Sequence, residues 1–289
     1  MNFFDNHTHS EFSPDSRMTM EQDIAAAVGK GLGGIAITDH LDLDVPRDSG
    51  AFVFDIAAQQ KKIAESIGKI DETIGRINDI QKGKKKPFKV LKGIEVGLQP
   101  VSVRHTLDYV AQFKFDTVIA SIHFVDGQDP YFGSYYKGKT PMQAYGRTFE
   151  LMLSTALEYE DFDILGHFDY VARYAPYDDK NVTYKEFANY LEPLLKFLAD
   201  NGKALEINTK SYEAGVSHGV GTANALKFDL NILRRFRDFG GEAVSLGSDA
   251  HDPDRVGNNF KTYWQMVQHC GFKYLCYFER RKPVFYRPE

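Results

Sequence analysis

The chain has 289 residues and 43% of them are hydrophobic, so it can bury a large core in one barrel or in two smaller domains. Its 35 Lys and Arg residues face 40 Asp and Glu residues, and the net charge of −5 provides no general positive field for nucleic acid or an anionic membrane. A small substrate is easier to accommodate, and no run of about 18 apolar residues exists to span a bilayer.

The first stretch with chemical character is Asp5-Asn6-His7-Thr8-His9. Phe3 and Phe4 before it favour a buried strand, on which His7 and His9 point to the same side. Two imidazoles on one face can share a metal ion, although the same pair would also fit packing or surface histidines. Because this strand opens the chain without a charged and apolar leader, we expect no signal peptide and a cytoplasmic protein.

The next elements alternate between helix and strand. The sequence predicts a helix over 21–30, a buried strand over 34–38 that ends at His40, and a long helix over 55–81 whose isoleucine stripe belongs to the core. A strand over 89–96 then carries Glu95 among apolar neighbours, where an unpaired carboxylate would be costly. Glu95 therefore needs partners.

The middle of the chain continues this alternation. A helix over 101–113 precedes a strand over 117–122, which delivers His123 to a loop over 126–139 that is rich in Gly, Asp and Tyr and is expected to shape a pocket. Thr140-Pro141 indicates the start of a helix. The remaining predictions are a strand over 162–166 that ends at His167, a helix that starts with a capping box over 183–186, a strand over 204–208, a helix over 228–239, and a strand over 243–246 followed by Asp249 and His251.

These roughly seven strands alternate with helices, which predicts a parallel α/β sheet covered by helices. In an α/β barrel the carboxyl ends of the strands form the active face, and closure brings the first strand beside the last. His7 and His9 would then approach Asp249 and His251. No long linker, repeat or low-complexity segment divides the chain, so we expect a single domain over 1–289.

Nearly every histidine or carboxylate that stands out beside an apolar run falls at the end of a predicted strand. Imidazole and carboxylate together suit Zn, Mn or Fe, and Glu95 among apolar residues could bridge two ions. The candidates are His7, His9, His40, Glu95, His123, His167, Asp249 and His251.

At this point the sequence resembles the polymerase and histidinol phosphatase (PHP) superfamily, and within it the histidinol-phosphate phosphatases. The resemblance covers nearly the whole chain in family order. The superfamily resemblance is carried by Asp5-Asn6-His7-Thr8-His9-Ser10, Thr38-Asp39-His40, Gly93-Ile94-Glu95, Ser121-Ile122-His123, Gly166-His167-Phe168-Asp169 and Gly247-Ser248-Asp249-Ala250-His251. The closer resemblance to the histidinol-phosphate phosphatases is carried by 121–127, 166–174 and Glu206-Ile207-Asn208-Thr209.

The resemblance implies a distorted (β/α)7, TIM-like barrel with three divalent metal ions. It assigns one ion to His7, His9, Glu95 and Asp249, a second to Glu95, His123 and His167, and a third to His40 and His251. The remaining ligand of the third site is often histidine in relatives. Asp15 stands at that position here, and a carboxylate would alter the metal preference of the site.

The resemblance also implies hydrolysis of a phosphate monoester, L-histidinol phosphate, in histidine biosynthesis. The metals would activate water to hydroxide, orient phosphate oxygens and neutralise charge on the leaving group; no residue is assigned as general acid. Arg173 and Lys210 are expected to hold phosphate oxygens, and Arg255 is a weaker candidate. Asp42 and Asp44 would reach the pocket mouth and bind the substrate's cationic amine, unless they are solvated loop carboxylates.

Other functions remain open from the sequence. A PHP phosphodiesterase or exonuclease is possible, but the negative net charge offers no basic track for a strand. A metal-dependent amidohydrolase commonly uses a carboxylated lysine to bridge its metal ions, whereas Glu95 takes that place here. In an amidohydrolase the third-site residues His40 and His251 would also be redundant. A non-catalytic metal-binding module is disfavoured by the nearly complete ligand set.

The two cysteines, Cys270 and Cys276, lie far from the histidine-rich stretches and are expected to be reduced and structural.

Overall fold

A computed structural model describes residues 2–43, 45, 52–81, 88–212 and 226–288, and for residues 70–81 it describes the backbone alone. The strands are β1 (Phe4–Thr8), β2 (Gly34–Ile37), β3 (His40–Leu41), β4 (Lys89–Gly97), β5 (Thr117–Ser121), β6 (Ile164–Leu165), β7 (Ala204–Asn208), β8 (Val244–Gly247), β9 (Leu275–Glu279) and β10 (Lys282–Tyr286). The helices are α1 (Met20–Gly29), α2 (Ile56–Gln81), α3 (Val103–Val110), α4 (Pro141–Tyr159), α5 (Tyr170–Arg173), α6 (Tyr184–Asp200), α7 (Leu230–Asp238) and α8 (Phe260–His269), with short 3-10 turns η2 (Pro130–Phe132), η3 (Ser134–Tyr136) and η4 (Thr209–Tyr212).

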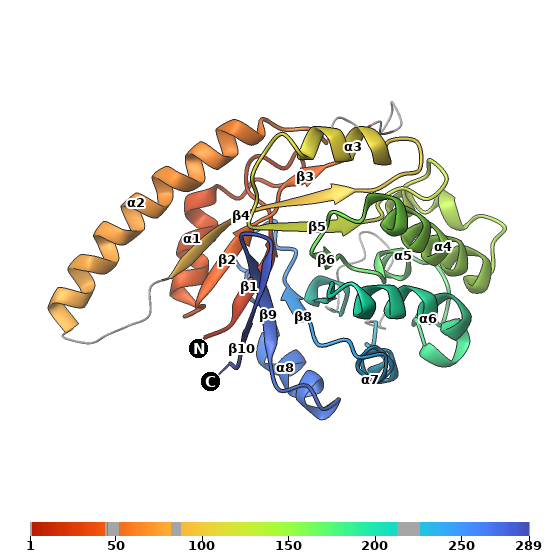
Figure 1. Ribbon diagram of the computed structural model, residues 1–289. Helices are drawn as coiled ribbons and strands as arrows, with labels where there is room; N and C mark the ends of the chain where they lie inside the picture. Colours follow the sequence, from red (N-terminus) through yellow and green to blue (C-terminus); the bar gives the residue numbers. More distant parts are fainter. Residues whose placement is uncertain (1, 44, 46–51, 82–87, 213–225, 289) are drawn as a thin grey trace.

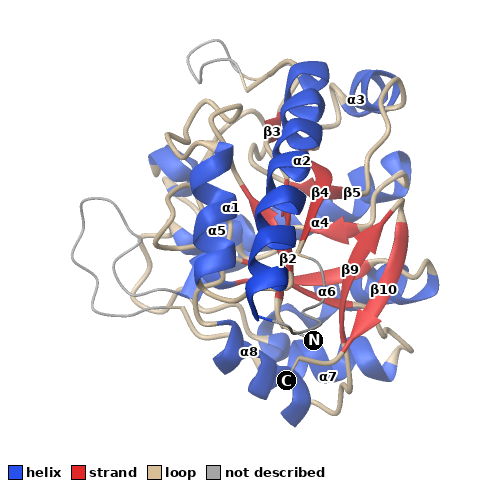
Figure 2. Cartoon of the chain, turned by 90° about the vertical axis from the view of Figure 1, so that its left-hand side faces the viewer, coloured by secondary structure: helices blue, strands red, loops and turns tan. Residues whose placement is uncertain are grey.

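The parallel strands form a barrel, and helices cover it from outside (Figure 1, Figure 2). The strand order is β1-β2-β4-β5-β6-β7-β8, with the short β3 beside β4. Thr8 pairs with Ala250 across the closing edge, where the Asp249 amide donates to the His7 carbonyl (2.8 Å) and the His9 amide to the Ala250 carbonyl (2.9 Å). This confirms the predicted α/β fold, a distorted (β/α)7 TIM-like barrel.

The barrel strands are buried on both faces. Every residue of β1, β2, β5, β7 and β8 is buried, because one face packs inside the barrel and the other against the helices. Such strands read as continuous apolar runs, so the few polar residues on them stand out in the sequence. No helix within the described ranges is long and apolar enough to cross a membrane.

Local sequence signals explain where the long helices begin. At α4 the Thr140 side chain accepts from the Gln143 amide, Gln143 caps Thr140 in return, and Pro141 occupies the first turn, as predicted. At α6 the Thr183 side chain accepts from the Glu186 amide. The predicted capping box is only half formed there, because the Glu186 carboxylate accepts from the Thr183 hydroxyl (2.7 Å) and not from its backbone N–H.

The isoleucine stripe of α2 is in the core where its side chains are described. Ile56 and Ile63 are buried, and Ile67 packs against the same core. The side chains of Ile70, Ile74, Ile77 and Ile80 lie outside the described part of the structure.

The antiparallel hairpin β9–β10, which was not predicted from the sequence, packs at the end of the barrel opposite the strand carboxyl ends, where its Arg280 amide donates to Asp116 just before β5. Its Cys276 and Phe278 pack in one apolar cluster with residues from the starts and interiors of barrel strands: Ile119, Ile164, Ala204 and Ala243. The Tyr286 hydroxyl accepts from the Phe4 amide (3.0 Å), so the last strand of the chain holds the first. Cys270 and Cys276 are free and buried, as predicted.

Candidate active site

All the predicted metal ligands meet at the carboxyl end of the barrel. The structure places His7 on β1, His40 on β3 and Glu95 on β4, while the others follow strands directly or, for Asp15, lie in the loop after β1. The parallel arrangement brings these strand ends to one rim. The residues gathered there are His7, His9, Asp15, His40, Glu95, His123, His167, Asp249 and His251.

Glu95 lies at the centre of the group and is fully buried. Its Oε2 lies 3.2 Å from His7 Nε2, 3.5 Å from His9 Nε2 and 2.7 Å from His40 Nδ1. Its Oε1 lies 3.2 Å from His123 Nε2 and 2.8 Å from His167 Nε2. The two carboxylate oxygens therefore face different sets of imidazoles, which is the geometry needed to bridge two cations.

The electrostatics of Glu95 fit this position. Burial alone would raise the pKa of the carboxyl, but the nearby imidazoles of His7, His40 and His123 outweigh it and hold the pKa well below its usual range. Glu95 is thus an ionised, buried carboxylate that needs positive charge beside it. Metal ions can supply that charge without requiring protonated histidines.

The donor atoms also converge as metal ligands do. His7 Nε2 and His9 Nε2 are 3.1 Å apart, and His40 Nδ1 and Glu95 Oε2 form no directed hydrogen bond despite their 2.7 Å separation. Within the described residues, groups of donor atoms lie within 4.8 Å of one another: His7, His9 and Glu95; Glu95, His123 and His167; His9, His40 and His251; and His40, Asp42 and His123. The first two groups agree with two of the expected ligand sets, and imidazole with carboxylate suits divalent ions such as Zn.

The atoms of the third expected ligand set are less closely spaced than those of the first two sets. Asp15 Oδ2 lies 3.1 Å from His251 Nε2 and 3.6 Å from His40 Nε2, so these residues do come together. Asp15 is the most exposed of them, and His9 joins the two histidines more closely than the sequence suggested. The imidazoles outweigh burial and lower the pKa of Asp15.

Outer carboxylates orient the ligand imidazoles, and sequence reasoning missed them. Glu206 accepts at 2.7 Å from both His7 Nδ1 and the His167 amide. Asp42 lies 2.9 Å from His123 Nδ1. A carboxylate on the second ring nitrogen fixes the tautomer and leaves Nε2 free to bind a metal. The sequence shows that Glu206 and Asp42 are carboxylates, but which imidazoles they contact depends on how the barrel closes.

Asp42 was expected to reach the pocket and bind an amine, or else to be a solvated loop carboxylate; it does line the cavity, and the solvated alternative is wrong. Its side chain is 2% accessible and is engaged by His123. Asp42 directly follows β3, and its carboxylate lies against Gly97 at the end of the neighbouring strand β4. Asp44, the other residue predicted to bind an amine, lies outside the described residues.

The predicted phosphate-binding cations flank Asp249. Arg173 Nη1 lies 3.1 Å from Asp249 Oδ2, and Lys210 Nζ lies 3.1 Å from both Asp249 Oδ1 and His251 Nδ1. Arg173 also donates to Asn208 Oδ1 (3.2 Å). Burial would raise the pKa of Asp249, but Lys210 and the surrounding donors hold it well below its usual range.

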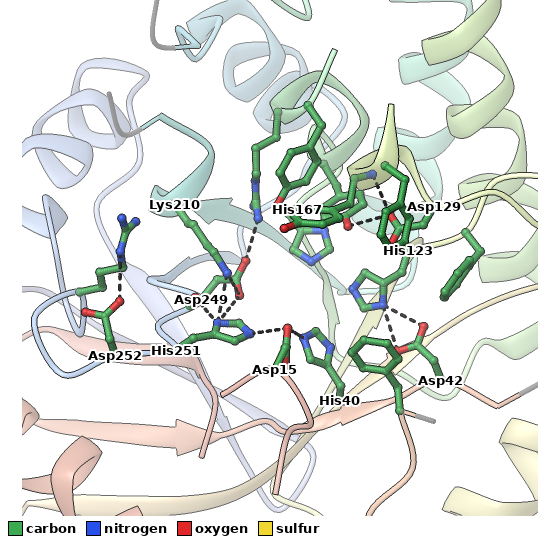
Figure 3. Close-up of a pocket in the computed structure, with 18 residues that line it drawn as sticks. Asp15, His40, Asp42, His123, Asp129, His167, Lys210, Asp249, His251 and Asp252 are labelled. Atoms are coloured by element: carbon green, nitrogen blue, oxygen red, sulfur yellow. Dashed lines mark hydrogen bonds and ion pairs between the residues drawn. The ribbon is translucent and has the colours of Figure 1, made fainter. Parts of the chain in front are cut away.

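These side chains line one cavity of about 510 Å³ (Figure 3). Arg173, Lys210 and Arg255 are among its lining residues, and the expected loop contributes Asp129 and Phe132, which confirms that the loop shapes the pocket. Arg255 pairs with Asp252 (3.2 Å) at the rim. The cavity therefore combines a buried set of metal-binding groups with cations, which suits a small anionic ligand.

Comparison with known proteins agrees with this geometry. The PHP domain profile matches residues 5–210. The probable histidinol-phosphatase of Clostridium acetobutylicum is 33% identical over 278 residues, which cover 96% of this chain and 97% of that protein. The histidinol-phosphatase of Lactococcus lactis is 28% identical over 283 residues, covering 98% and 96%.

A solved structure extends the similarity to three dimensions. The crystal structure of histidinol phosphate phosphatase from Lactococcus lactis, complexed with Zn, L-histidinol and phosphate, matches with a TM-score of 0.79 and 27% identity. The match covers 98% of this chain and 99% of that chain. The chain therefore belongs to the PHP domain family and, within it, to the histidinol phosphatases.

Proposed function

We propose that the protein hydrolyses L-histidinol phosphate to L-histidinol and inorganic phosphate with bound divalent metal ions. The observation that carries this proposal is the convergence of histidines on the buried Glu95, next to a cavity that Arg173 and Lys210 also line. The substrate is supported by the Lactococcus lactis relative, which holds L-histidinol and phosphate in its crystal structure. A small anionic ester is also the ligand that the size and charge of the cavity favour.

We propose three metal ions, and Zn, Mn and Fe all suit the donor atoms. The Zn in the Lactococcus lactis structure supports zinc. Ions bound here would lower the pKa of water, orient phosphate oxygens and neutralise the leaving group. The proposed ligand sets are His7, His9, Glu95 and Asp249; Glu95, His123 and His167; and Asp15, His40 and His251.

The chain's own residues would prepare the site for the phosphate. Asp249 holds Arg173 and Lys210 on its two carboxylate oxygens, so both cations are fixed before a substrate arrives. Arg173 is 3% accessible and keeps donors close to the cavity, where they can bind phosphate oxygens without reorganising. Glu206 and Asp42 hold the rings of His7 and His123 in one orientation.

The test is a phosphate-release assay coupled to elemental analysis. The purified protein would be assayed on L-histidinol phosphate, p-nitrophenyl phosphate and bis(p-nitrophenyl) phosphate, before and after chelation and reloading with Zn, Mn or Fe. We expect activity to disappear on chelation, to return with metal, and to show the highest kcat/KM on L-histidinol phosphate.

Other outcomes would identify the rival functions. Preference for the diester would support a phosphodiesterase or exonuclease, and cleavage of a C–N bond in place of the ester would support an amidohydrolase. Bound metal without turnover of any ester would support a non-catalytic module.

We also propose that this reaction serves histidine biosynthesis in the cytoplasm, and that residues 1–289 form a single domain. The free state of Cys270 and Cys276 fits a reducing compartment. The packing of Cys276 and Phe278 against barrel residues supports one domain, because the C-terminal hairpin shares the barrel's apolar contacts.

A further inference from the structure

The cavity has two chemically different sides. In Figure 3, Lys210, His251 and Asp252 lie on one side of His167, while His123, Asp42 and Asp129 lie on the other. The first side holds the cations that suit a phosphate. Aromatic residues also line the cavity, and the Tyr170 ring lies between the two sides, packed against His123 (centroids 5.6 Å apart) and under the Arg173 guanidinium (5.4 Å).

Asp129 differs from the other carboxylates that line the cavity. Its Oδ1 accepts from the Tyr131 amide (2.8 Å) and from the Tyr170 hydroxyl (3.1 Å), and both donors are neutral. Burial raises the pKa of Asp129, and the Tyr131 amide, the nearby His123 imidazole and the Tyr170 hydroxyl lower it only in part. The other carboxylates each lie against a cation or an imidazole: Asp249 against Arg173 and Lys210, Asp252 against Arg255, Asp15 against His251, and Asp42 against His123.

The backbone holds Asp129 firmly in this position. Val125 and Gln128 exchange hydrogen bonds (2.9 and 3.0 Å) across a two-residue turn in which Asp126 and Gly127 have φ of 51° and 75°. An Asp-Gly pair suits such a turn, because both residues tolerate positive φ. Asp129 then caps the 3-10 turn η2 with its own side chain. The carboxylate is therefore presented by a rigid segment.

We propose that Asp129 binds the ammonium group of the alcohol portion of the substrate, and that the neighbouring aromatic side chains cover the rest of that portion. This inference rests on the proposed function, since L-histidinol phosphate carries an ammonium group two carbons from its ester oxygen. With the phosphate on the Arg173 side, the ammonium group extends toward the side where Asp129 lies. The faces of the neighbouring aromatic rings would attract the ammonium group and stack against the imidazole ring of the substrate.

The experiment combines a change in the enzyme with a change in the substrate. Asp129→Asn keeps the size of the side chain and removes its charge. We expect kcat/KM for L-histidinol phosphate to fall about 10- to 100-fold, mainly through KM, which corresponds to one lost charge-assisted hydrogen bond. For the desamino analogue 3-(imidazol-4-yl)propyl phosphate, wild type and Asp129→Asn should differ by less than about 3-fold.

Asp126→Asn is the matched control. Asp126 lies in the same loop, but its carboxylate is exposed and pairs with Arg147 (2.6 Å), away from the cavity lining. Asparagine also tolerates the positive φ of this position. This variant should keep wild-type kcat/KM on both substrates. Tyr170→Phe, which removes one donor to Asp129, should weaken use of L-histidinol phosphate in the same direction but by less.

Binding of L-histidinol, measured by calorimetry, provides a readout that does not depend on turnover. Asp129→Asn should weaken this binding, and Asp126→Asn should not. If Asp129→Asn lowers kcat/KM equally for both substrates, or changes neither, Asp129 does not recognise the amine, although the proposed function stands. If wild type itself shows no preference for L-histidinol phosphate over the desamino analogue and p-nitrophenyl phosphate, the proposed function fails first.

Discussion

The two ends of the barrel use the same charged residue types in opposite ways. At the carboxyl end, Glu95 is surrounded by imidazole nitrogens, and its Oε2 has no directed hydrogen bond. At the opposite end, Asp163 accepts from the Val118 amide (2.8 Å) and from Arg281 Nε (2.5 Å). Asp116 accepts there from the amides of Lys92 and Arg280 at 3.0 Å.

This difference separates function from stability. The carboxylates at the hairpin end are neutralised by the chain itself, so their interactions stabilise the fold whether or not a ligand is present. At the carboxyl end, Glu95 lies among imidazoles that are proposed metal ligands, and Asp249 holds the two cations proposed to bind phosphate, so these interactions would serve ions and substrate. Changes at one end should therefore alter activity and metal content, and changes at the other should alter the free energy of unfolding.

The largest effect is expected at the centre of the carboxyl end. Glu95→Gln should lower metal content and activity together, because the charge shared between neighbouring cations is lost. The fall in kcat/KM should exceed about 100-fold, since even residues that only support a ligand cost about 10- to 100-fold. Elemental analysis and phosphate release measure both quantities. Full activity with normal metal content would contradict the bridging role.

Arg173→Ala should separate substrate binding from metal binding at the same end. Loss of one preorganised charged donor costs about 2–4 kcal/mol of transition-state stabilisation, or about 30- to 1,000-fold in kcat/KM. Metal content should stay normal. Arg147→Ala, which removes an arginine that pairs with the exposed Asp126 carboxylate, should leave the kinetics unchanged. Unaltered kinetics in Arg173→Ala would mean that the phosphate is held elsewhere.

Asp42→Asn tests the buried partner of His123. Asparagine can still accept from the imidazole but no longer favours its orientation by charge, so metal affinity or kcat/KM should fall about 10- to 100-fold. The fall should be equal for L-histidinol phosphate and p-nitrophenyl phosphate. A larger fall for the amine-bearing substrate would restore Asp42 to the recognition role expected from the sequence.

At the hairpin end, Arg281→Ala should reduce stability while leaving kcat/KM within about 2-fold. The buried Asp163 loses a donor, and an unsatisfied group of this kind costs about 1–3 kcal/mol. Urea denaturation would measure the loss. Arg147→Ala, with its exposed pair, should cost less than about 1 kcal/mol in the same assay. Equal stability of Arg281→Ala and wild type would break the contrast between the two ends.

The loss in Arg281→Ala should also depend on pH. Burial raises the pKa of Asp163 and Arg281 counteracts it, so the variant has a still higher pKa at this carboxyl. The folded variant then binds a proton more tightly than the unfolded chain, and its stability falls as pH rises through the folded pKa. The stability difference from wild type should therefore shrink as pH falls toward the ordinary value of 3.8.

The metal-binding end was predictable because its signals are local. A histidine directly after a short apolar run, as at His123 and His167, indicates a strand end from the local sequence alone. Barrel topology then determines that these ends meet. The roles of Glu206 and Asp42 were not predictable, because each acts through an imidazole from another strand and depends on the exact register between strands.

The hairpin was missed because its turn carries no recognisable signal. Arg280 and Arg281 occupy the two turn positions with φ of 53° and 62°. Turns of this type usually contain Asn-Gly or Asp-Gly, and arginine at both positions does not indicate one. Tertiary contacts compensate for the unusual backbone, since the Arg281 side chain binds Asp163 and its amide donates to the Asp116 carbonyl (2.8 Å).

The hydrogen bond between the Phe4 amide and the Tyr286 hydroxyl has a consequence for biogenesis. Two of the partners of β1, Ala250 and Tyr286, lie far along the chain, so β1 cannot make these contacts until those residues have been synthesised. Contacts so distant in sequence slow folding, and the strand edge stays open until they form. His7 and His9 therefore cannot join Asp249 in the proposed ligand set until β8 and the residues after it have been synthesised.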